Sequence, residues 1–233
     1  MVRTAIILAG GLGTRLRKVA PKVPKPMAPI NNRPFLEYQM DYWINQGITQ
    51  FILSVGYLKD VIINHFSNSY KGISIEYVEE SSPLGTGGGL LFAAKNLHET
   101  FVVLNGDTFF EVNINSLYKF HLKRSSNWTF ALFRSDEIDR YMFMDIDQKG
   151  EIVSLKSNNN VLNGLANGGV YLIEPEALRV FDYSIGDKVS LENELLPSYI
   201  AKGNALYGQE CIGKFIDIGI PQDYYRSISI LSD

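Results

Sequence analysis

The sequence has little cysteine and little histidine, which limits the chemistry it can carry. Its 233 residues include one cysteine and three histidines. A single cysteine, Cys211, excludes a disulfide within the chain, and the histidines lack the spacing of a metal site. We expect Cys211 to be a small buried hydrophobe in a strand, and we assign the histidines no function.

The sequence also lacks long apolar runs and a strong charge of either sign. No run approaches the length of a membrane span, and the apolar stretch 5–8 is too short for the core of a signal peptide. The net charge of −3 argues against a general nucleic-acid-binding protein, so any cationic site must be local. We therefore expect a cytoplasmic protein with no membrane or nucleic-acid partner.

What the chain does have is an ordinary globular composition, with 45% hydrophobic and 20% charged residues. Its length suffices for one large α/β domain with a substantial core. The sequence contains no internal repeat, low-complexity segment or linker. We predict a single domain over residues 1–233, with a second subregion that begins after about residue 110.

Short apolar runs alternate with helical patterns through the first half of the chain. The patterns predict strands at 5–8, 51–55, 73–78 and 101–104, and helices at 34–47, 58–66 and 87–97. This alternation is typical of a Rossmann-like α/β fold, with a mostly parallel sheet and helices on both faces. The second half predicts hairpin-type strands at 128–134, 141–146, 151–155, 168–173, 204–207 and 214–218, then a helix from Pro221. The sheet should therefore be mixed.

A glycine-rich turn follows the first strand directly. Residues 10–16 read Gly-Gly-Leu-Gly-Thr-Arg-Leu, and residues 24–26 read Pro-Lys-Pro. Glycines at such a turn expose backbone N–H groups and let a phosphate approach closely, and Arg15 and Lys25 add two cations that suit a polyphosphate. The turn is not a dinucleotide fingerprint, because Leu16 replaces the third glycine, and it is not a Walker A loop.

Two aspartates follow predicted strands. Asp107 comes directly after the strand at 101–104, and Asp217 lies at the end of a late strand. Carboxylates beside a phosphate site are natural ligands of Mg²⁺, although a helix cap or a turn is the alternative role for each, and especially for Asp217. The Asp-Ile-Asp segment at 145–147 lies in a hairpin, which favours a turn over a metal motif.

Residues 10–16 and 24–26 together resemble the signature of the sugar-phosphate nucleotidylyltransferases. Residues 84–88, Leu-Gly-Thr-Gly-Gly, are similar to the family segment that wraps the nucleotide base. Residues 217–221, Asp-Ile-Gly-Ile-Pro, are similar to its late aspartate segment, with Ile220 in place of the usual threonine. The resemblance extends nearly to the end of the chain, and the motifs follow one another in the family order.

The resemblance implies that a nucleoside triphosphate and a sugar 1-phosphate give a nucleotide sugar and pyrophosphate, for surface polysaccharide synthesis. It implies Mg²⁺ held by Asp107 and Asp217, and catalytic roles for Arg15 and Lys25. The nucleotide-binding part should be about 1–110, and the sugar-binding part about 111–233. The implied nucleotide-binding residues are Leu8, Gly10, Gly11, Gly13, Thr14, Glu80, Gly85 and Thr86. The implied sugar-phosphate-binding residues are Asn105, Lys156, Asn167, Gly168 and Glu192.

The sugar motifs depart from the family pattern. Lys156 matches the lysine of a Glu-Lys-Pro motif, but Leu155 and Ser157 replace its neighbours, and Met142 stands where many members have glycine. These departures indicate an unusual sugar. The chain, in its short form, is most similar to members that act on a manno-heptose 1-phosphate with GTP.

Glu80 lies five residues before Gly85, at a distance where family members often contact the base. An ionised carboxylate accepts hydrogen bonds only, so it can pair with the two adjacent donors of guanine, whereas uracil and thymine present one donor between acceptors. Glu80 therefore favours GTP, unless Glu79 or backbone groups read the base. The open alternatives are UTP or dTTP, another hexose 1-phosphate, a non-catalytic nucleotide-sugar sensor and a glycosyltransferase. Homo-oligomerisation also stays open.

Overall fold

The computed structural model describes residues 1–13, 16, 22–137, 139–156 and 162–231, with the side chain of Lys156 excepted. These residues form one ten-stranded sheet, two small two-stranded sheets and helices on both faces of the large sheet. The predicted Rossmann-like α/β fold is thereby confirmed. None of the helices in the described residues has the length and apolar composition that crossing a membrane requires.

The parallel half of the sheet is centred on β1 (Thr4–Leu8). This strand pairs in parallel with β4 (Gln50–Val55) and with β7 (Phe101–Asn105), and β4 pairs in parallel with β6 (Ile73–Glu79). The connecting helices are α1 (Phe35–Asn45), α2 (Lys59–Phe66) and α3 (Gly85–Ala94). Because these strands are parallel, their carboxyl ends meet along one edge of the sheet.

The antiparallel half continues the same sheet through β12 (Gly164–Ile173), which pairs with β7. The strand order is β11-β10-β12-β7-β1-β4-β6-β5, and β9 pairs with both β12 and β13. The strands added on this side are β9 (Trp128–Ser135), β10 (Phe143–Ile146), β11 (Ile152–Lys156) and β13 (Tyr207–Glu210), whereas β5 (Ser69–Tyr70) pairs with β6 at the other edge of the sheet. The sheet is mixed, as the sequence predicts.

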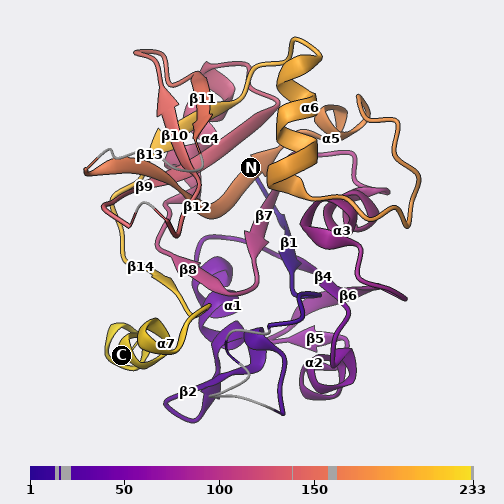
Figure 1. The fold of residues 1–233 in the computed structure, drawn as a ribbon. Helices are drawn as coiled ribbons and strands as arrows, with labels where there is room; N and C mark the ends of the chain where they lie inside the picture. The colour runs from indigo at the N-terminus through magenta and orange to yellow at the C-terminus, as the bar shows by residue number, and fades with distance from the viewer. Residues whose placement is uncertain (14–15, 17–21, 138, 157–161, 232–233) are drawn as a thin grey trace.

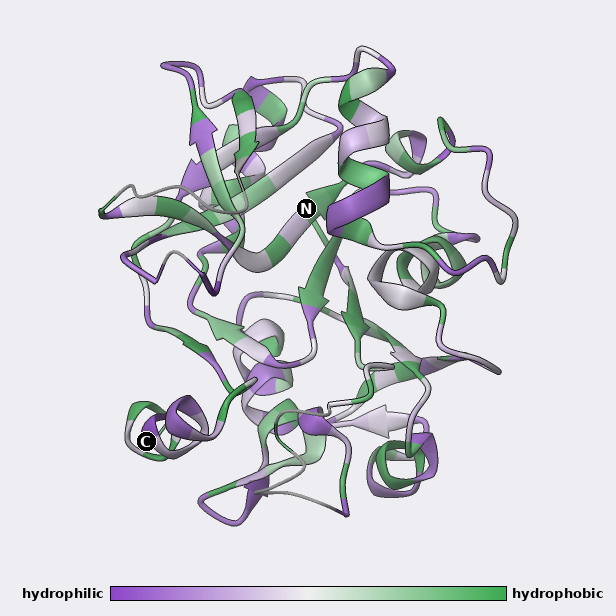
Figure 2. Ribbon diagram, viewed as in Figure 1, coloured by the Kyte–Doolittle hydropathy of each residue, from purple (hydrophilic) through white to green (hydrophobic). Residues whose placement is uncertain are grey.

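Each face of the sheet carries its own apolar core. Alternate residues of a strand point to opposite faces, so Ile7 of β1 packs in one core and Ile6 in the other. The first core includes residues of α1, α2 and α4 (Ile114–Lys123), and the second includes residues of α3 and α6 (Leu196–Ala201). Figure 2 shows the central strands in green, the colour of hydrophobic residues.

Several short elements gather near the edge where the parallel strands end. They are the 3₁₀ helix η1 (Lys25–Met27), the hairpin β2 (Pro29–Ile30) with β3 (Arg33–Pro34), and the π-helix η2 (Leu191–Leu195). The short helix α5 (Pro175–Leu178) lies at the opposite edge, because it follows the end of β12, which pairs with the start of β7. Strand β8 (Thr108–Phe110) pairs with β14 (Phe215–Asp217), which leads into α7 (Pro221–Ile230). Figure 1 shows α7 beside β14 at the periphery of the molecule. The β8–β14 pairing brings the late part of the chain to the end of β7.

Two local predictions need correction. The strand expected at 204–207 lies at Tyr207–Glu210, because Gly203 and Asn204 complete the turn that ends α6, with the Asn204 amide donating to the Tyr199 carbonyl at 3.2 Å. Cys211 lies one residue beyond β13 and is half-buried rather than within a strand. Burial raises the pKa of the Cys211 thiol to about 12, so the thiol stays protonated near neutral pH.

Gln39 of α1 fixes the loop that follows β7. Its side chain is buried, with 2% exposed, and its amide nitrogen donates to the carbonyl oxygens of Asn105 at 2.8 Å and Thr108 at 2.7 Å. These carbonyls lie on either side of Gly106 and Asp107. A helix on one face of the sheet therefore determines the position of Asp107.

We expect Gln39→Met to lower the free energy of unfolding by about 1–3 kcal/mol, because methionine fills a similar volume but leaves two carbonyls without a donor. Part of this loss of stability should be offset, because the substitution also removes Oε1 of Gln39, a buried acceptor that has no partner among the described residues. Urea denaturation measures the change. The matched control is Gln148→Met at an exposed turn position, which should stay within about 0.5 kcal/mol of the wild type. Equal losses in the two variants would contradict the role of Gln39.

Candidate functional site

A pocket of about 560 Å³ opens where β1, β6 and β7 end. Its walls come from the glycine-rich turn, η1, the residue after β6, the start of α3, the loop after β7 and the segment that leads into η2. The predicted site residues that line it are Leu8, Gly10, Gly11, Gly13, Lys25, Glu80, Gly85, Thr86, Asn105, Asp107 and Glu192. The fold thus brings together residues spread over most of the chain.

The remaining predicted site residues are either outside the described part of the chain or outside this pocket wall. Thr14 and Arg15 fall outside the described residues, as does the side chain of Lys156. Asn167 and Gly168 lie on β12 and are not in the pocket wall, and Asp217 lines a neighbouring hollow of about 620 Å³. Among these, Asn167 and Gly168 are connected to the pocket through intermediate groups, and Asp217 approaches Lys25 of the pocket wall.

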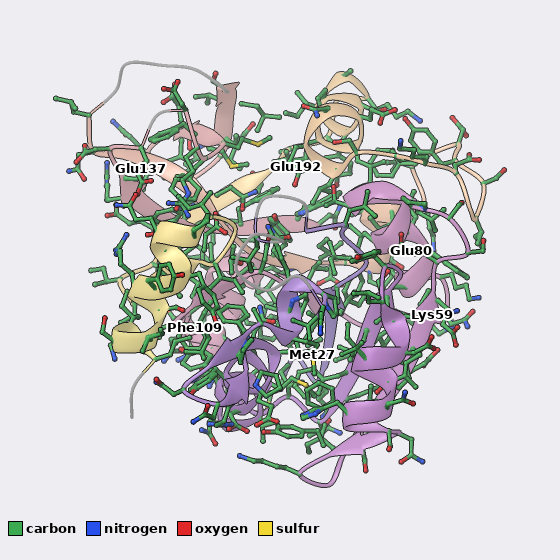
Figure 3. All side chains as sticks on the ribbon, turned by 60° about the horizontal axis from the view of Figure 1, so that its bottom comes forward. Met27, Lys59, Glu80, Phe109, Glu137 and Glu192 are labelled. Atoms are coloured by element: carbon green, nitrogen blue, oxygen red, sulfur yellow. The ribbon has the colours of Figure 1, made fainter. Side chains whose placement is uncertain are left out.

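Glu80 is fixed against the glycine-rich turn. Its Oε1 accepts a hydrogen bond from the Ser54 hydroxyl at 3.0 Å, and its Oε2 accepts one from the Leu84 N–H at 3.0 Å. A Cβ atom at Gly10 would lie 2.3 Å from Oε1, so this approach requires glycine. Glu80, labelled in Figure 3, is the residue that follows β6. The carboxylate is held in the pocket wall and retains lone pairs for a ligand.

Glu79, the neighbouring carboxylate, is turned away from the pocket. It forms an ion pair with Lys59 at 2.5 Å, its side chain is half exposed, and it does not line the cavity. Successive residues of a strand point to opposite faces, so only one of the two glutamates can face the site. Of the two glutamates, Glu80 is the one in the pocket wall, where it can contact a ligand.

Lys25 is a cation held in a fixed position. Its Nζ lies 2.6 Å from Oδ2 of Asp107, and only 11% of its side chain is exposed. Gly13 has φ +58°, and a Cβ there would lie 3.0 Å from Cγ of Lys25. A left-handed backbone with so little room favours glycine, and it lets the lysine chain cross beneath the turn.

The β8–β14 pair carries Asp217 to this place. Asp217 pairs with Thr108 in the ladder, and the Ile218 N–H donates to the Asp107 carbonyl at 3.0 Å. A Cβ at Gly219 would lie 2.6 Å from Oδ1 of Asp217 and 3.2 Å from Nζ of Lys25, so both groups reach one small space. Asp217 also accepts the Gly219 N–H at 2.6 Å, the turn-forming role that the sequence leaves open.

The carboxylates of Asp107 and Asp217 suit a divalent cation. Burial raises the pKa of Asp217, and the charge of Asp107 raises it further, against the lowering effect of the Gly219 N–H and of Arg140. A cation between the two would relieve that repulsion. Among the described residues no group of three or more His, Cys, Asp or Glu could hold a metal. Such a site therefore needs substrate oxygens as well, as is usual for Mg²⁺.

Arg140 supports Asp217, and sequence reasoning assigns it no role. It donates to the main-chain oxygen of Asp217 at 3.0 Å and pairs with its Oδ2 at 3.1 Å. It also pairs with the buried Asp223 and with Glu137. Burial lowers the pKa of Arg140, but the carboxylates outweigh this effect and the pKa is raised. The guanidinium therefore orients Asp217 as a permanent cation.

Lys188 is a second residue that sequence reasoning missed. It is exposed, lines the pocket and stands shortly before Glu192 in the chain. Its place four residues before Glu192, a predicted site residue, is the one signal that the sequence offers. It adds a cation to the wall that carries Glu192.

Asn167 is connected to the pocket by a chain of hydrogen bonds. Its amide donates to the Tyr171 hydroxyl at 3.0 Å, and that hydroxyl donates to Oδ1 of Asn105 at 3.5 Å. Burial raises the pKa of Tyr171, which keeps its hydroxyl a donor. Gly168 is packed on Phe110, where a Cβ would lie 2.5 Å from the ring. Asn167 thus acts on the site through Asn105, and Gly168 provides close packing.

The chain matches a protein-family model described as nucleotidyl transferase over residues 4–233. It is 40% identical over 224 residues to D-glycero-alpha-D-manno-heptose 1-phosphate guanylyltransferase of Campylobacter jejuni, covering 95% of this chain and 97% of that protein. The protein of the same name from Aneurinibacillus thermoaerophilus is 41% identical over 225 residues, 96% of each chain.

Two crystal structures resemble the fold over its whole length. They are HddC from Yersinia pseudotuberculosis, with a TM-score of 0.86 and 33% identity, and HddC complexed with GMP-PN, with a TM-score of 0.83 and 32% identity. Each similarity covers 99% of this chain and 100% of the other. The likeness therefore includes both halves of the sheet and the elements around the pocket.

We expect Asp217→Asn to change how stability depends on pH when divalent cations are absent. Because the folded pKa of Asp217 lies above its ordinary value of 3.8, folding favours the protonated carboxyl, and the free energy of unfolding should fall as the pH rises from 3.8 through the raised pKa. The asparagine variant should lack this part of the decline. Urea denaturation in a chelating buffer, between about pH 4 and about pH 7, measures it.

The control for this measurement is Asp60→Asn, at an exposed position of α2, which should follow the wild type. Mg²⁺ should stabilise the wild type more than Asp217→Asn, because ligands that bind the folded state raise its stability by mass action. Superimposable pH profiles and equal responses to Mg²⁺ would show that Asp217 is a turn residue only.

Proposed function

Because this chain belongs to the nucleotidyl transferase family, we propose that it transfers a guanylyl group from GTP to a manno-heptose 1-phosphate and releases pyrophosphate. The observation that carries the proposal is the identity of 40% and 41%, over almost the whole of each chain, to two proteins with that name. The composition of the pocket supports it, since the pocket combines a glycine-rich turn, the cations Lys25 and Lys188 and a carboxylate suited to guanine.

The reaction is governed by charge. A phosphate oxygen of the sugar 1-phosphate attacks the α-phosphorus of GTP, and the bond from that phosphorus to the bridging oxygen of the β-phosphate breaks, so that pyrophosphate leaves with the electron pair. The nucleophile is already an anion, so the enzyme needs no general base. It has to hold two anions together and stabilise the charge that develops in the transition state.

The proposed nucleotide site uses the turn after β1. Backbone N–H groups of Gly10, Gly11 and Gly13, together with Thr14 and Arg15, would bind the phosphates of GTP. Lys25 would stand between the reacting phosphates, and its ion pair with Asp107 supports this role because it fixes the ammonium group before substrates bind. Leu8, Gly85 and the backbone of Thr86 would form the wall around the nucleoside.

The proposed metal ligands are Asp107 and Asp217. When bound, Mg²⁺ would withdraw charge from the phosphate oxygens as a Lewis acid. Arg140 and the Gly219 N–H would keep the Asp217 carboxylate oriented toward Asp107. The mutual repulsion of the two carboxylates supports this assignment.

The proposed sugar 1-phosphate site occupies the second part of the chain, about 111–233, facing the nucleotide part of about 1–110. Lys156 and Lys188 would attract the phosphate. Glu192 and Asn105 would bind sugar hydroxyls, and Asn167 would orient Asn105 through Tyr171. Gly168 would keep β12 close to this layer.

We expect Lys25→Ala to fold normally and to lower kcat by about a hundredfold or more, the scale for losing one charged contact to the transition state. Pyrophosphate release from GTP and a manno-heptose 1-phosphate measures the rate. The matched control is Lys22→Ala, an exposed lysine that does not line the pocket. A kcat within about threefold of the wild type corresponds to less than 1 kcal/mol of barrier and would remove Lys25 from the mechanism.

Glu80 is the proposed reader of the base. Ser54 and Leu84 use one lone pair on each carboxylate oxygen, which leaves one on each for the N1–H and N2 amino groups of guanine. Uracil and thymine would turn carbonyl oxygens toward this carboxylate, and adenine would turn its N1 acceptor. The fixed geometry of Glu80 therefore favours GTP.

We expect Glu80→Gln to lower the preference for GTP over UTP by about 1–3 kcal/mol, the range for a good bidentate contact with a base. The measurement compares kcat/KM for GTP, UTP, dTTP and ATP across a panel of sugar 1-phosphates. Glu79→Gln is the matched control, because Glu79 pairs with Lys59 outside the pocket and should leave the preference unchanged. A preference that survives Glu80→Gln would exclude Glu80, and a wild type that prefers UTP would refute guanylyl transfer.

A further inference from the structure

Thr86 connects the two parts of the pocket through its side chain. Its hydroxyl donates to Oε2 of Glu192 at 2.9 Å and accepts the N–H of Leu191 at 3.0 Å. Thr86 lies in the first turn of α3, whereas both partners belong to η2, more than a hundred residues later in the chain. One hydroxyl thus joins the nucleotide wall to the sugar wall.

The backbone around Thr86 makes the same connection. The N–H groups of Gly87 and Gly88 donate to the carbonyl of Val189 at 2.9 Å and 3.1 Å, and the N–H of Val189 donates to the carbonyl of Leu84 at 2.8 Å. The start of α3 is therefore capped by the segment that leads into η2. Two N–H groups of its first turn, which have no partner within the helix, are therefore bonded to the protein itself.

The glycines of this segment are needed for that contact. A Cβ at Gly85, where φ is +74°, would lie 2.6 Å from the carbonyl oxygen of Val189, and a Cβ at Gly88 would lie 2.4 Å from that of Asp187. Both atoms are backbone and cannot move aside as a side chain would. The glycine-rich sequence, which resembles a base-binding segment, therefore serves to dock residues 187–191.

Glu192 depends on this docking for its orientation. It lies in the π-helix η2, a rare conformation that often marks functional sites, and it lines the pocket. Within the described part of the chain, Thr86 is its hydrogen-bond partner, and Asn105 lines the same pocket. Glu192 and Glu80, both labelled in Figure 3, come from opposite parts of the chain.

We propose that Thr86 is a positioning residue whose hydroxyl orients the Glu192 carboxylate toward the hydroxyl groups of the sugar 1-phosphate. One Glu192 oxygen accepts from Thr86, and the remaining lone pairs accept from the sugar. This proposal rests on the proposed function and assigns the Thr86 side chain to the sugar rather than to the nucleotide. The wall that encloses the nucleotide thereby sets the affinity for the second substrate.

The test compares Thr86→Val, which keeps the shape and loses the hydroxyl, with Thr86→Ser, which keeps the hydroxyl. Thr86→Val should raise the KM for the sugar 1-phosphate about threefold to tenfold, the scale of one lost hydrogen bond, and should raise the KM for GTP less, because valine keeps the shape of the nucleotide wall. Thr86→Ser should behave as the wild type. A rise in the KM for GTP alone, or no change in either KM, would overturn the proposal.

A double-mutant cycle tests whether Thr86 acts through Glu192. If it does, Thr86→Val should have a smaller effect on the sugar KM in a Glu192→Ala background, which lacks the acceptor of the Thr86 hydroxyl, whereas fully additive effects would overturn the proposal.

Amide hydrogen exchange gives a readout that does not depend on activity. The Leu191 N–H should exchange faster in Thr86→Val and at the wild-type rate in Thr86→Ser, and equal exchange in the two variants would refute the contact.

Failure of the wild type to use GTP and a manno-heptose 1-phosphate would count against the proposed function. The positioning role would then be tested with the sugar 1-phosphate that the wild type does accept.

Discussion

The parallel pairing of β1 with β4 and β7 is the constraint on which the rest of the structure depends. In this register Leu8 lies beside both Ser54 and Asn105, so the glycine-rich turn and the loop that carries Asp107 begin at the same level of the sheet. Val55 and Glu79 end the neighbouring pair, which brings Glu80 to that level too. Because the register of each strand pair is fixed, three polar loops that are far apart in the sequence surround one space.

Charge is the second organising feature of this edge. The chain has a net charge of −3, yet Lys25 and Arg140 are placed against Asp107 and Asp217, where they offset two carboxylates that repel each other. These pairs are partly buried, so solvent screens them less than it would at the surface. Such preformed charges suit a reaction between anions, since they need little rearrangement when the phosphates arrive.

The two halves of the chain are joined at the pocket as well as through the sheet. The β8–β14 pair carries Asp217 to Asp107, and the glycines at the start of α3 accept the segment before η2. Both junctions depend on close backbone approach. The sequence motifs that depart from the family pattern, around Met142 and Lys156, lie in the second half, the part proposed to bind the sugar.

The sequence by itself determined the parallel strands, the glycine-rich turn and the residues of its motifs, because these features arise from local periodicity and from the backbone freedom of glycine. It could not decide whether Glu79 or Glu80 lines the pocket. That depends on which side chain at the end of β6 points toward the pocket. It gave no partner for Arg140 or for Thr86, whose contacts span 77 and 106 residues. Those pairings were decided by the tertiary structure, because strand register and helix docking alone bring such distant side chains within hydrogen-bond distance.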